Sequence, residues 1–373
     1  MRIILIGCGH IGSVLAADLA ENMPSSEIVV SDSDVKRVEE VISKIRRGNL
    51  SIAQLDAADY QNLVNVLKRF DIAVGLTPGR LGYQAVRACI ETGVDMVDLS
   101  YMPEDVMLLN QKALEAGVTV IPDCGLAPGL SNMFVGRAAS LLDQVEEAII
   151  LVGGIPEKPI PPLGYKVTWC VDDLIEEYTR RVKIVRDGRL VEVEALDGLE
   201  LIEFPEVGVL EAFYTDGVRT LHHTIKGVRN MWEKTLRYPG HAEKIKLLRD
   251  LGFFDEPYRQ TTMRLLEERL SLPELRDLVV MSVKVIGLRG GSRVAYIYHL
   301  LDRYDDVGKV TAMARTTAYT ASIVIQLLAR GEIREKGIIP PENLGMSEEI
   351  FNKIISWLRN KGIKIWGEEQ AHR

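Results

Sequence analysis

A glycine-rich turn near the amino terminus is the first segment whose residues suit a ligand. Gly7-Cys8-Gly9-His10-Ile11-Gly12 has the spacing G-x-G-x-x-G, after an apolar run and before a helical pattern. The first glycine permits a tight turn, the second lets backbone approach a pyrophosphate, and the third lets the helix pack closely on the sheet. Asp32 lies twenty residues after Gly12, where an acidic residue binds the adenosine ribose. These residues together predict a dinucleotide site, in preference to a purely structural glycine turn.

The charge of Asp32 predicts which dinucleotide binds. A carboxylate at this position repels the 2′-phosphate of NADP, so we expect the cofactor NAD. Lys36 and Arg37 lie one turn later and would soften that preference. His10 and Ile11 are placed with the cofactor because they belong to the phosphate-binding turn, although a chemical role for the His10 imidazole is not expected.

Further candidates follow the ends of other apolar runs, because ligands of parallel sheets bind beyond the carboxyl ends of the strands. We expect Asp56 near the adenine and Thr77-Pro78-Gly79 near the nicotinamide half of the cofactor. Asp98 follows the next run and is also placed with the cofactor, whereas Tyr101 is placed with the substrate. Asp123 opens the segment after the sixth run. Loop and helix capping explains the two aspartates that follow the fifth and sixth runs about as well as a role in the site.

Arg237-Tyr238-Pro239-Gly240-His241 is a second group of chemical interest, and it precedes a helical stretch that ends near Leu251. A helix N-terminus attracts carboxylates, and arginine holds a carboxylate through two parallel hydrogen bonds. We therefore expect Arg237 to bind a substrate carboxylate. His241 lies in the first helical turn, where the positive end of the helix dipole would keep the imidazole neutral and able to accept a proton. The alternative is a surface arginine with a capping histidine.

A third group, Tyr165–Trp169, follows a proline-dense loop. Strand-like alternation would place Tyr165, Val167 and Trp169 on one face and Lys166 on the other. Lys166 is a candidate base or carboxylate anchor, and a solvated lysine is an equally good interpretation.

The helix expected at Asp172–Arg180 adds Glu176, Glu177 and Tyr178. These groups would bind an amine, although a solvated acidic face is the commoner explanation. The pair His222-His223 has no third ligand in the sequence pattern and is interpreted as helix surface, so no metal site is expected.

The elements that must position these groups alternate between strand and helix through the first 125 residues. Short apolar runs predict buried parallel strands at Arg2–Ile6, Ile28–Ser31, Ser51–Leu55, Ile72–Leu76, Val94–Asp98 and Val118–Pro122. Amphipathic patterns predict helices at Ile11–Glu21, Val35–Ile45, Tyr60–Phe70, Tyr83–Thr92 and Pro103–Ala116. Six strands with five crossover helices indicate an α/β fold, a doubly wound parallel sheet of the Rossmann type.

The alternation stops near Leu130. Asp187-Gly188 between two short apolar runs predicts a β-hairpin, and Leu288–Ser292 predicts another. The second region is therefore expected to be an α+β domain with a mixed or antiparallel sheet. The expected domains are residues 1–129 for NAD, joined by the returning segment 311–335, residues 130–310 for substrate and dimer contacts, and a small tail at 336–373.

Composition excludes several classes of protein. Of 373 residues, 47% are hydrophobic and 26% are charged, as in ordinary globular enzymes. The net charge of −8 argues against nucleic acid as a partner, and no apolar run is long enough to span a membrane. The four cysteines form no CxxC pair, which is typical of a reducing cytoplasm and argues against zinc or disulfides.

Several blocks, in this order along nearly the whole chain, resemble the saccharopine dehydrogenase family, and most closely its lysine 6-dehydrogenase branch. The blocks are the glycine turn, Val97–Ser100, Asp123–Asn132, Lys166–Trp169 with Leu174–Tyr178, Thr235–His241 and Gly337–Glu342. The glycine turn is common to many dehydrogenases, whereas Asp123–Asn132 and Thr235–His241 are more specific.

The resemblance implies a homodimer that deaminates the ε-amine of L-lysine oxidatively with NAD. The products would be 2-aminoadipate 6-semialdehyde, which cyclises to piperideine-6-carboxylate, and ammonia. The amine has a pKa near ~10.4 in water, so a base must help to remove its proton before hydride leaves. We assign proton transfer to His241, the substrate carboxylate to Arg237, the amine or attacking water to Asp123, and a second candidate base to Lys166. Trp169 is placed in the substrate site.

The sequence is also compatible with other functions. A saccharopine reductase would need cationic partners for a second dicarboxylate, and a related dehydrogenase would act on a polyamine-like substrate. A non-enzymatic NAD-binding redox sensor is the alternative from a different class, and NADH formation with any amino acid would exclude it.

Overall fold

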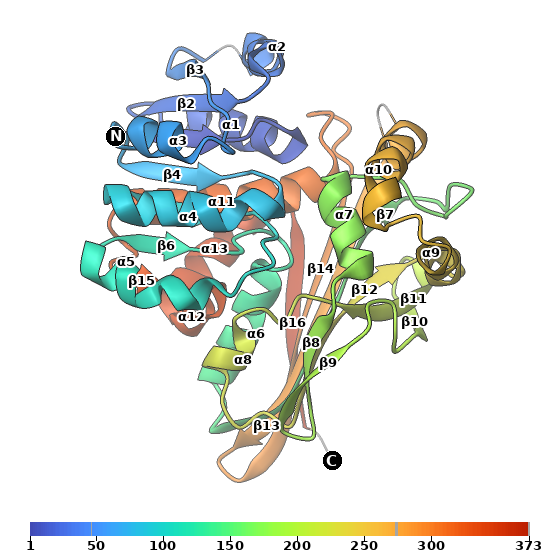
Figure 1. Ribbon diagram of the computed structural model, residues 1–373. Helices are drawn as coiled ribbons and strands as arrows, with labels where there is room; N and C mark the ends of the chain where they lie inside the picture. Colours follow the sequence, from blue (N-terminus) through green and yellow to red (C-terminus); the bar gives the residue numbers. More distant parts are fainter. Residues whose placement is uncertain (46, 273–274, 372–373) are drawn as a thin grey trace. The chain divides into compact units, whose positions relative to one another are not determined.

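The computed structural model describes residues 1–45, 47–272 and 275–371 (Figure 1). The chain divides into two compact units by its internal contacts. Unit 1 comprises Met1–Leu130 and Ala314–Leu358, and unit 2 comprises Ser131–Met313 and Arg359–Arg373. The expected tail at 336–373 is thus shared between the two units, and its last two residues lie outside the described part of the chain.

Unit 1 is built on a parallel sheet, which has seven strands in the described residues, in the order β15-β6-β5-β4-β1-β2-β3. The strands are β1 Arg2–Ile6, β2 Glu27–Asp32, β3 Leu50–Gln54, β4 Ile72–Gly75, β5 Asp95–Asp98, β6 Thr119–Ile121 and β15 Gly337–Ile338. All neighbouring strands pair in parallel. The Rossmann-type sheet expected from the sequence is therefore confirmed.

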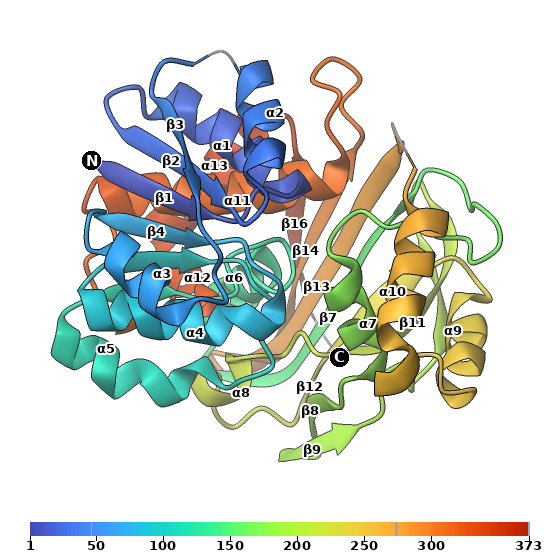
Figure 2. The same ribbon diagram turned by 45° about the horizontal axis from the view of Figure 1, so that its top comes forward.

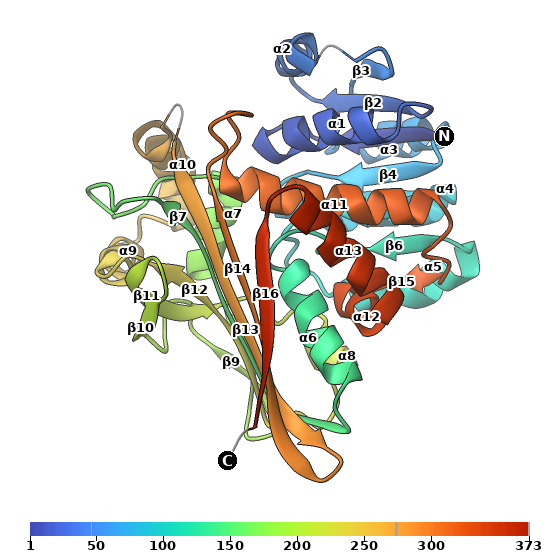
Figure 3. The same ribbon diagram turned by 180° about the vertical axis from the view of Figure 1, so that it is seen from behind.

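Helices cover both faces of this sheet. Their bounds are α1 His10–Asn22, α2 Val35–Ile45, α3 Tyr60–Leu67, α4 Gly79–Thr92, α5 Asn110–Ala116, α11 Ala312–Ala329, α12 Pro341–Met346 and α13 Glu348–Asn360, with the 3₁₀ helix η1 at Val106–Leu109. Figure 1 shows α3 and α4 on one face, and Figure 3 shows α1 and α11 on the other. A hydrogen bond of 2.6 Å from Ser322 of α11 to Asp18 of α1 joins the two helices inside the unit. Strands covered on both faces need apolar residues throughout, which is the pattern that predicted them.

Strand β15 was not predicted. Gly337 and Ile339 donate backbone hydrogen bonds to Val118 and Val120 beside β6, and the side chain of Asn110 accepts from Ile338 N–H at 2.8 Å. Two residues with such distant partners carry no period-two pattern, so only the fold brings them into the sheet.

Unit 2 contains a mixed sheet, which has nine strands among the described residues, in the order β10-β11-β12-β7-β13-β14-β16 with the β8–β9 hairpin attached to β12. The strands are β7 Gln144–Pro156, β8 Val182–Arg186, β9 Arg189–Val193, β10 Glu200–Phe204, β11 Gly208–Thr215, β12 Asn230–Arg237, β13 Asp277–Arg289, β14 Ser292–Arg303 and β16 Lys364–Ala371. β7 and β12 pair in parallel, and the other neighbours pair antiparallel. Figure 3 shows β16 lying along β14. The predicted α+β domain is confirmed.

The helices of unit 2 include two, α7 and α10, that pack side by side (Figure 2). Their bounds are α6 Leu130–Ser140, α7 Val171–Thr179, α8 Leu221–Thr224, α9 His241–Asp250 and α10 Glu256–Leu270. Arg259 of α10 holds the carboxylates of Asp172 and Glu176 on α7 at 2.8 and 2.7 Å. The strand-like alternation expected for residues 165–169 is wrong, because this segment has irregular backbone, and Tyr165 is buried while Trp169 is half-buried. No helix in the described residues has the length and hydropathy needed to cross a membrane.

Candidate cofactor and substrate sites

The three glycines of the amino-terminal turn each have a distinct environment in unit 1. Gly7 has a φ of +118°, and a Cβ there would lie 2.5 Å from the carbonyl oxygen of Leu76. A Cβ on Gly12 would lie 2.7 Å from the carbonyl oxygen of Gly7, so α1 can approach the turn only with glycine at this position. Among the described residues, no atom lies within 4 Å of the Cβ position of Gly9. The second glycine therefore faces open space, where the motif brings a pyrophosphate close to backbone.

Helix α1 begins directly after this turn with its N-terminus uncapped. Gly9 is the N-cap and makes no side-chain hydrogen bond, and no acidic residue occupies the first turn. The first N–H groups of a helix have no partner within it and carry the positive end of the dipole. The open space at Gly9 and this free helix end fit the two phosphates of a dinucleotide.

Asp32, at the end of β2, lies against the same turn. Its Oδ2 accepts a hydrogen bond from Cys8 N–H at 2.8 Å, and its Oδ1 accepts one from Asp34 N–H at 3.0 Å. Burial and the neighbouring carboxylate raise the pKa of the Cys8 thiol to about 11, so that sulfur stays protonated. The structure thus brings Asp32 to the glycine turn and leaves Cys8 without a reactive thiolate.

Strands β1 and β4 are neighbours, so the segments that follow them meet at one edge of the sheet. Leu76 N–H donates to the Ile6 carbonyl at 3.0 Å. Thr77 follows and is buried, and its Oγ1 has no hydrogen-bond partner in the described part of the chain. Pro78 and Gly79 begin α4. Crossovers leave β1 and β4 toward opposite faces, which makes this edge the switch point where such sheets bind ligands, and the orphan hydroxyl fits a ligand there.

Asp98 ends strand β5, Asp123 lies in the loop after β6, and both residues are buried in unit 1. The Oδ2 of Asp98 accepts hydrogen bonds from the N–H and Oγ of Ser100 at 3.1 and 2.6 Å, and its carboxylate packs against the backbone of Gly75. Asp123 has a φ of +51°, and Cys124 N–H donates to the Asp98 carbonyl at 2.8 Å. The segments after β5 and β6 are therefore joined by a backbone hydrogen bond. The Asp98 carboxylate caps its own loop, which was the alternative to a role in the cofactor site.

Two other expected residues of unit 1 lie in loops. Asp56 is exposed after β3 and accepts a hydrogen bond from Ala58 N–H at 2.9 Å, as in a loop cap. Tyr101 is half-buried in the loop after β5. Neither position adds to the geometry of the glycine turn.

Arg237 ends β12 in unit 2 and is buried. Its Nη2 donates to Glu177 Oε2 at 2.9 Å, with side-chain exposures of 4% and 10%. Its Nη1 donates to the Leu236 carbonyl, and the guanidinium lies 4.4 Å over the Tyr165 ring. Its Nε has no hydrogen-bond partner among the residues that the structure describes. The Glu177 charge raises the pKa of the guanidinium against the effect of burial. Arg237 is therefore no surface arginine, and the carboxylate it holds belongs to α7.

Two N–H groups at the start of α9 already donate to an internal carboxylate. Glu211 of β11 accepts from Gly240 N–H at 2.7 Å through Oε2 and from Ala242 N–H at 2.5 Å through Oε1. We expected this helix end to attract a substrate carboxylate. That expectation is wrong, because the internal carboxylate of Glu211 already caps the helix.

His241 is fully buried with both ring nitrogens engaged. Nδ1 lies 3.0 Å from the Leu163 carbonyl, which can only accept, so Nδ1 carries the hydrogen and Nε2 accepts from the Tyr178 hydroxyl at 2.9 Å. Burial, with the Arg237 charge second, lowers the imidazole pKa from 6.5 to about 3. The ring is neutral as expected, but burial rather than the helix dipole is the main cause. Its lone pair orients Tyr178, so proton transfer by His241 stays a prediction that requires this bond to open.

Lys166 and Trp169 have internal partners. The Lys166 ammonium donates to the Arg269 carbonyl at 2.7 Å, and the Trp169 indole N–H donates to the Tyr165 hydroxyl at 3.3 Å. Both residues lie in the irregular segment before α7 and contribute to the packing of unit 2.

Sequence reasoning missed the polar row that supports Arg237. Thr235 Oγ1 donates to Glu177 Oε1 at 2.8 Å and lies 2.9 Å from Thr215 Oγ1. Glu233 is buried next to Thr215. Glu177 was interpreted as part of a solvated acidic face, although its place beside Tyr178, at the border of an apolar stripe, was a signal for burial.

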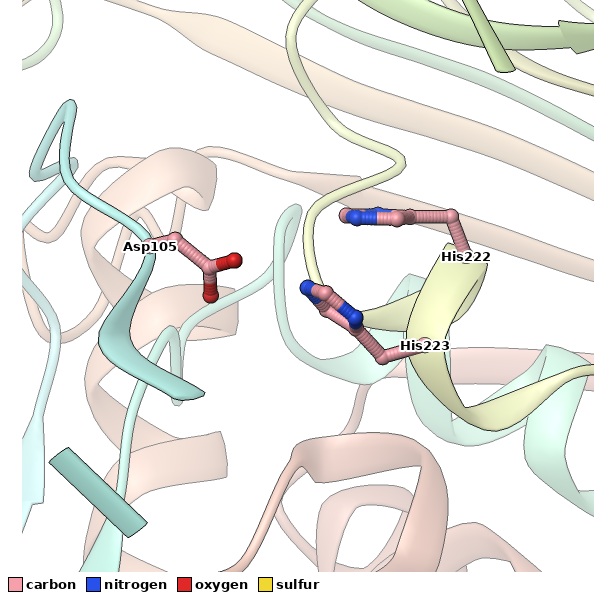
Figure 4. A group of neighbouring side chains, drawn as sticks. All are labelled: Asp105, His222 and His223. Atoms are coloured by element: carbon pink, nitrogen blue, oxygen red, sulfur yellow. The ribbon is translucent and has the colours of Figure 1, made fainter. Parts of the chain in front are cut away.

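His222 and His223 lie in α8 of unit 2, where Figure 4 shows their rings side by side. The ring centroids are 3.9 Å apart, and His222 Nδ1 lies 2.5 Å from the Arg219 carbonyl. Asp105, also labelled in Figure 4, is the N-cap of η1 in unit 1 and accepts from Met107 N–H at 3.0 Å.

Two family models match the chain. The model described as the saccharopine dehydrogenase NADP binding domain matches residues 3–121, and the model described as the saccharopine dehydrogenase C-terminal domain matches residues 125–363. Their boundary follows β6.

Three known proteins illustrate the similarity. The mitochondrial alpha-aminoadipic semialdehyde synthase of Mus musculus is 21% identical over 97% of this chain, which spans only 47% of that relative's length. The carboxyaminopropylagmatine dehydrogenase of Synechocystis sp. is 21% identical, with 92% of each chain covered. The solved structure of apo saccharopine dehydrogenase (L-Glu forming) from Saccharomyces cerevisiae has a TM-score of 0.79 at 20% identity, covering 99% of this chain and 100% of that one, and it therefore shares the fold.

Proposed function

Because the chain belongs to the saccharopine dehydrogenase family, we propose that it is an NAD-dependent dehydrogenase that oxidises the ε-amine carbon of L-lysine. The products are 2-aminoadipate 6-semialdehyde, which cyclises to piperideine-6-carboxylate, with ammonia, NADH and a proton. One water is consumed, and two electrons leave the carbon as hydride. The observation that best supports a dehydrogenase is the open space at Gly9 in front of the uncapped helix α1, where the phosphates of a dinucleotide would bind.

NAD is proposed over NADP because of Asp32. Its carboxylate lies at the glycine turn through the Cys8 N–H bond, where it favours ribose hydroxyls and opposes a 2′-phosphate. The family model that matches residues 3–121 is named for NADP, so the choice between the two dinucleotides belongs to this proposal. Comparing kcat/KM for NAD and NADP tests it.

When bound, the nicotinamide accepts the hydride from the substrate carbon. The chain's own residues must hold the cofactor, lower the barrier to losing the ammonium proton and activate water. Gly7, Gly9 and Gly12 shape the phosphate turn, and Thr77 offers a hydroxyl with no other partner at the adjacent strand end. Asp123 is the proposed group for the amine or the attacking water.

Unit 2 supplies the proposed substrate groups. Arg237 is the proposed carboxylate anchor, and since Glu177 holds it in this structure, binding would require the substrate to share or displace that carboxylate. His241 is the proposed group for proton transfer and Lys166 the second candidate base, which would have to lose the proton that its ammonium donates to the Arg269 carbonyl before it could accept one. Tyr178, held by neutral His241, joins them as a hydroxyl next to the same cluster.

The test is absorbance at the NADH band with NAD and a panel of primary amines that contains lysine, ornithine and diamines. The proposal expects lysine to give the highest kcat/KM. Ammonia released in a ratio of one per NADH would establish deamination, whereas NADH without ammonia would contradict it.

A second candidate is oxidation of a secondary amine in a larger substrate. It is favoured by the relatives named saccharopine dehydrogenase and carboxyaminopropylagmatine dehydrogenase, the second of which matches 92% of this chain. Saccharopine and carboxyaminopropylagmatine in the same assay separate this candidate from the first. Release of glutamate or another amino acid in place of ammonia would identify it.

A homodimer in the cytoplasm completes the proposal. The four cysteines are free thiols, which fits a reducing compartment. Light scattering of the purified chain would measure the oligomer, and a monomer at micromolar concentration would contradict the dimer.

A further inference from the structure

Alternation along β12 places three polar residues on one buried face. Glu233, Thr235 and Arg237 are two residues apart, so their side chains point to the same side of the strand, and all three are buried. Thr215 of β11 lies directly across from Glu233 in the antiparallel register. Glu177 of α7 contacts this row from the covering helix through Thr235 and Arg237. The row is therefore a continuous polar path inside unit 2.

The direction of the hydrogen bonds in this path is fixed by counting protons. Thr235 Oγ1 lies 2.8 Å from Glu177 Oε1, and that carboxylate can only accept, so Thr235 donates to it. Thr235 then has no proton left for Thr215, whose Oγ1 lies 2.9 Å away, so Thr215 donates to Thr235. Thr215 is left as an acceptor toward Glu233, whose Oε1 lies 3.4 Å from it. The path is complete only if the carboxyl group of Glu233 carries a proton.

The surroundings of Glu233 favour that protonated form. The side chain is 4% exposed, and no described residue forms a hydrogen bond with its Oε2. The charged groups that face it are Glu177 on α7 and Asp216 with Arg219 in the loop after β11, where Arg219 is paired with Asp216 at 3.1 Å. Its neighbour Lys234 points to the other face of β12 and binds Glu200 at 2.5 Å.

The Arg219 guanidinium favours the charged form of this carboxyl group, but its effect is smaller than the opposing effects of burial and the two neighbouring carboxylates. Burial, with Glu177 and Asp216 adding to it, raises the pKa of Glu233 from 4.5 to about 8. The carboxyl group also packs directly against the backbone of Gly217, where any Cβ would overlap it.

We propose that Glu233 is a positioning residue that bears a proton, and that its donation to Thr215 orients both threonine hydroxyls toward Glu177 and so holds the Glu177–Arg237 pair. This inference deepens the proposed function and rests on it, since Arg237 is the group assigned to the substrate. Glu233 itself is not assigned any contact with substrate.

Loss of the Glu233 proton reverses the direction of the hydrogen bonds along this path. A Glu233 carboxylate needs a donor, and Thr215 is the hydroxyl beside it. If Thr215 donates to Glu233, the Thr215–Thr235 bond survives only when Thr235 donates to Thr215. Glu177 Oε1 then loses its donor, and the Arg237 pair loses one of its supports. Turnover is therefore expected to fall as pH rises through the pKa of Glu233.

The experiment compares Glu233→Gln, Thr235→Val and a control, Thr262→Val, using the full chain and the best substrate of the amine panel. A glutamine amide donates to Thr215 at every pH, so Glu233→Gln should keep kcat at pH 7 within about threefold and lose the alkaline fall. Thr235→Val removes the bond to Glu177 and should lower kcat roughly 5- to 20-fold. Thr262 is also buried and donates to the Phe253 carbonyl, outside the path, so Thr262→Val should leave the pH profile unchanged. An alkaline limb in Glu233→Gln identical to that of the parent protein would overturn the proposal, as would equal effects of the two valine variants.

Infrared spectroscopy tests the same proposal without turnover. The parent protein at pH 7 should show the carbonyl band of a protonated carboxylic acid that Glu233→Gln lacks, and the band should titrate with a midpoint near pH 8. If no substrate of the panel is oxidised but the band is present, the proposed function fails and the proton on Glu233 stands. A difference spectrum without this band overturns the assignment, whatever the enzyme oxidises.

Discussion

Arg237 and Glu177 are each other's counter-ion inside unit 2. They lie sixty positions apart in the sequence, at the end of β12 and on α7, and their charged atoms are 2.9 Å apart. Each charge makes the burial of the other tolerable, because an isolated charge in a low-dielectric interior is costly. A substrate carboxylate that binds Arg237 must therefore compete with an internal one.

Removing one member of this pair should destabilise the fold. Arg237→Ala leaves the Glu177 carboxylate buried without its cation, and we expect a loss of about 3–5 kcal/mol in the free energy of unfolding by urea. Arg229 provides the control, since its side chain is 72% exposed beside Asp187, and Arg229→Ala should cost less than about 1 kcal/mol. Equal losses in the two variants would show that the buried pair contributes no more than a surface contact.

The glycine turn gives a matched pair of variants. Gly9 has a φ of −79° and open space around its Cβ position, so Gly9→Ala should fold normally but raise the Kd for NADH by about tenfold or more. Gly12→Ala places a methyl group against the Gly7 carbonyl and should cost about 1–3 kcal/mol of stability. NADH fluorescence titration and thermal melting measure the two effects. Unchanged NADH affinity in Gly9→Ala would remove the pyrophosphate from this turn.

Asp32 should control the choice of dinucleotide. Asp32→Ser removes the carboxylate that opposes a 2′-phosphate, and kcat/KM for NAD relative to NADP should fall by roughly tenfold or more. Initial rates with the two cofactors at saturating substrate report the ratio. Because the carboxylate also accepts from Cys8 N–H, a melting curve must accompany the rates. A ratio that does not move would assign selectivity to other residues of the site.

Protonation of His241 should lower the free energy of unfolding as the pH falls below 6.5. Its folded-state pKa is about 3 against 6.5 in the unfolded chain, so the unfolded state binds more protons between these values. The neutral ring's contribution is complete above pH 6.5 and is lost as pH falls toward 3, by an amount on the order of a few kcal/mol. The difference in unfolding free energy between the parent protein and His241→Gln should therefore shrink from pH 7 to pH 4.5. Exposed His10→Gln serves as the control, and parallel curves for both variants would contradict the assignment.

The strands and the cofactor turn of unit 1 could be predicted from the sequence because the patterns that indicate them are local. Continuous apolar runs, the glycine turn and Asp32 each depend on residues close in the chain, and these gave the strands β1 to β6 and the cofactor turn. The β8–β9 hairpin followed from Asp187-Gly188 for the same reason, since a two-residue turn fixes its own register.

The environment of the proposed substrate groups in unit 2 could not be predicted as well, because their partners are distant in the sequence. Strand β12 is buried on both faces but carries polar residues, so its sequence shows neither a continuous apolar run nor an apolar–polar alternation, and no strand was predicted there. Arg237 was identified as chemically important, yet its partner Glu177 and the cap of α9 by Glu211 depend on tertiary pairing that no spacing encodes.

Gly217 leaves no room between its backbone and the Glu233 carboxyl group. A larger amino acid at 217 would press on the acid unless position 233 shrank as well. A side chain at position 217 would therefore displace the Glu233 carboxyl group and lengthen or break its contact with Thr215.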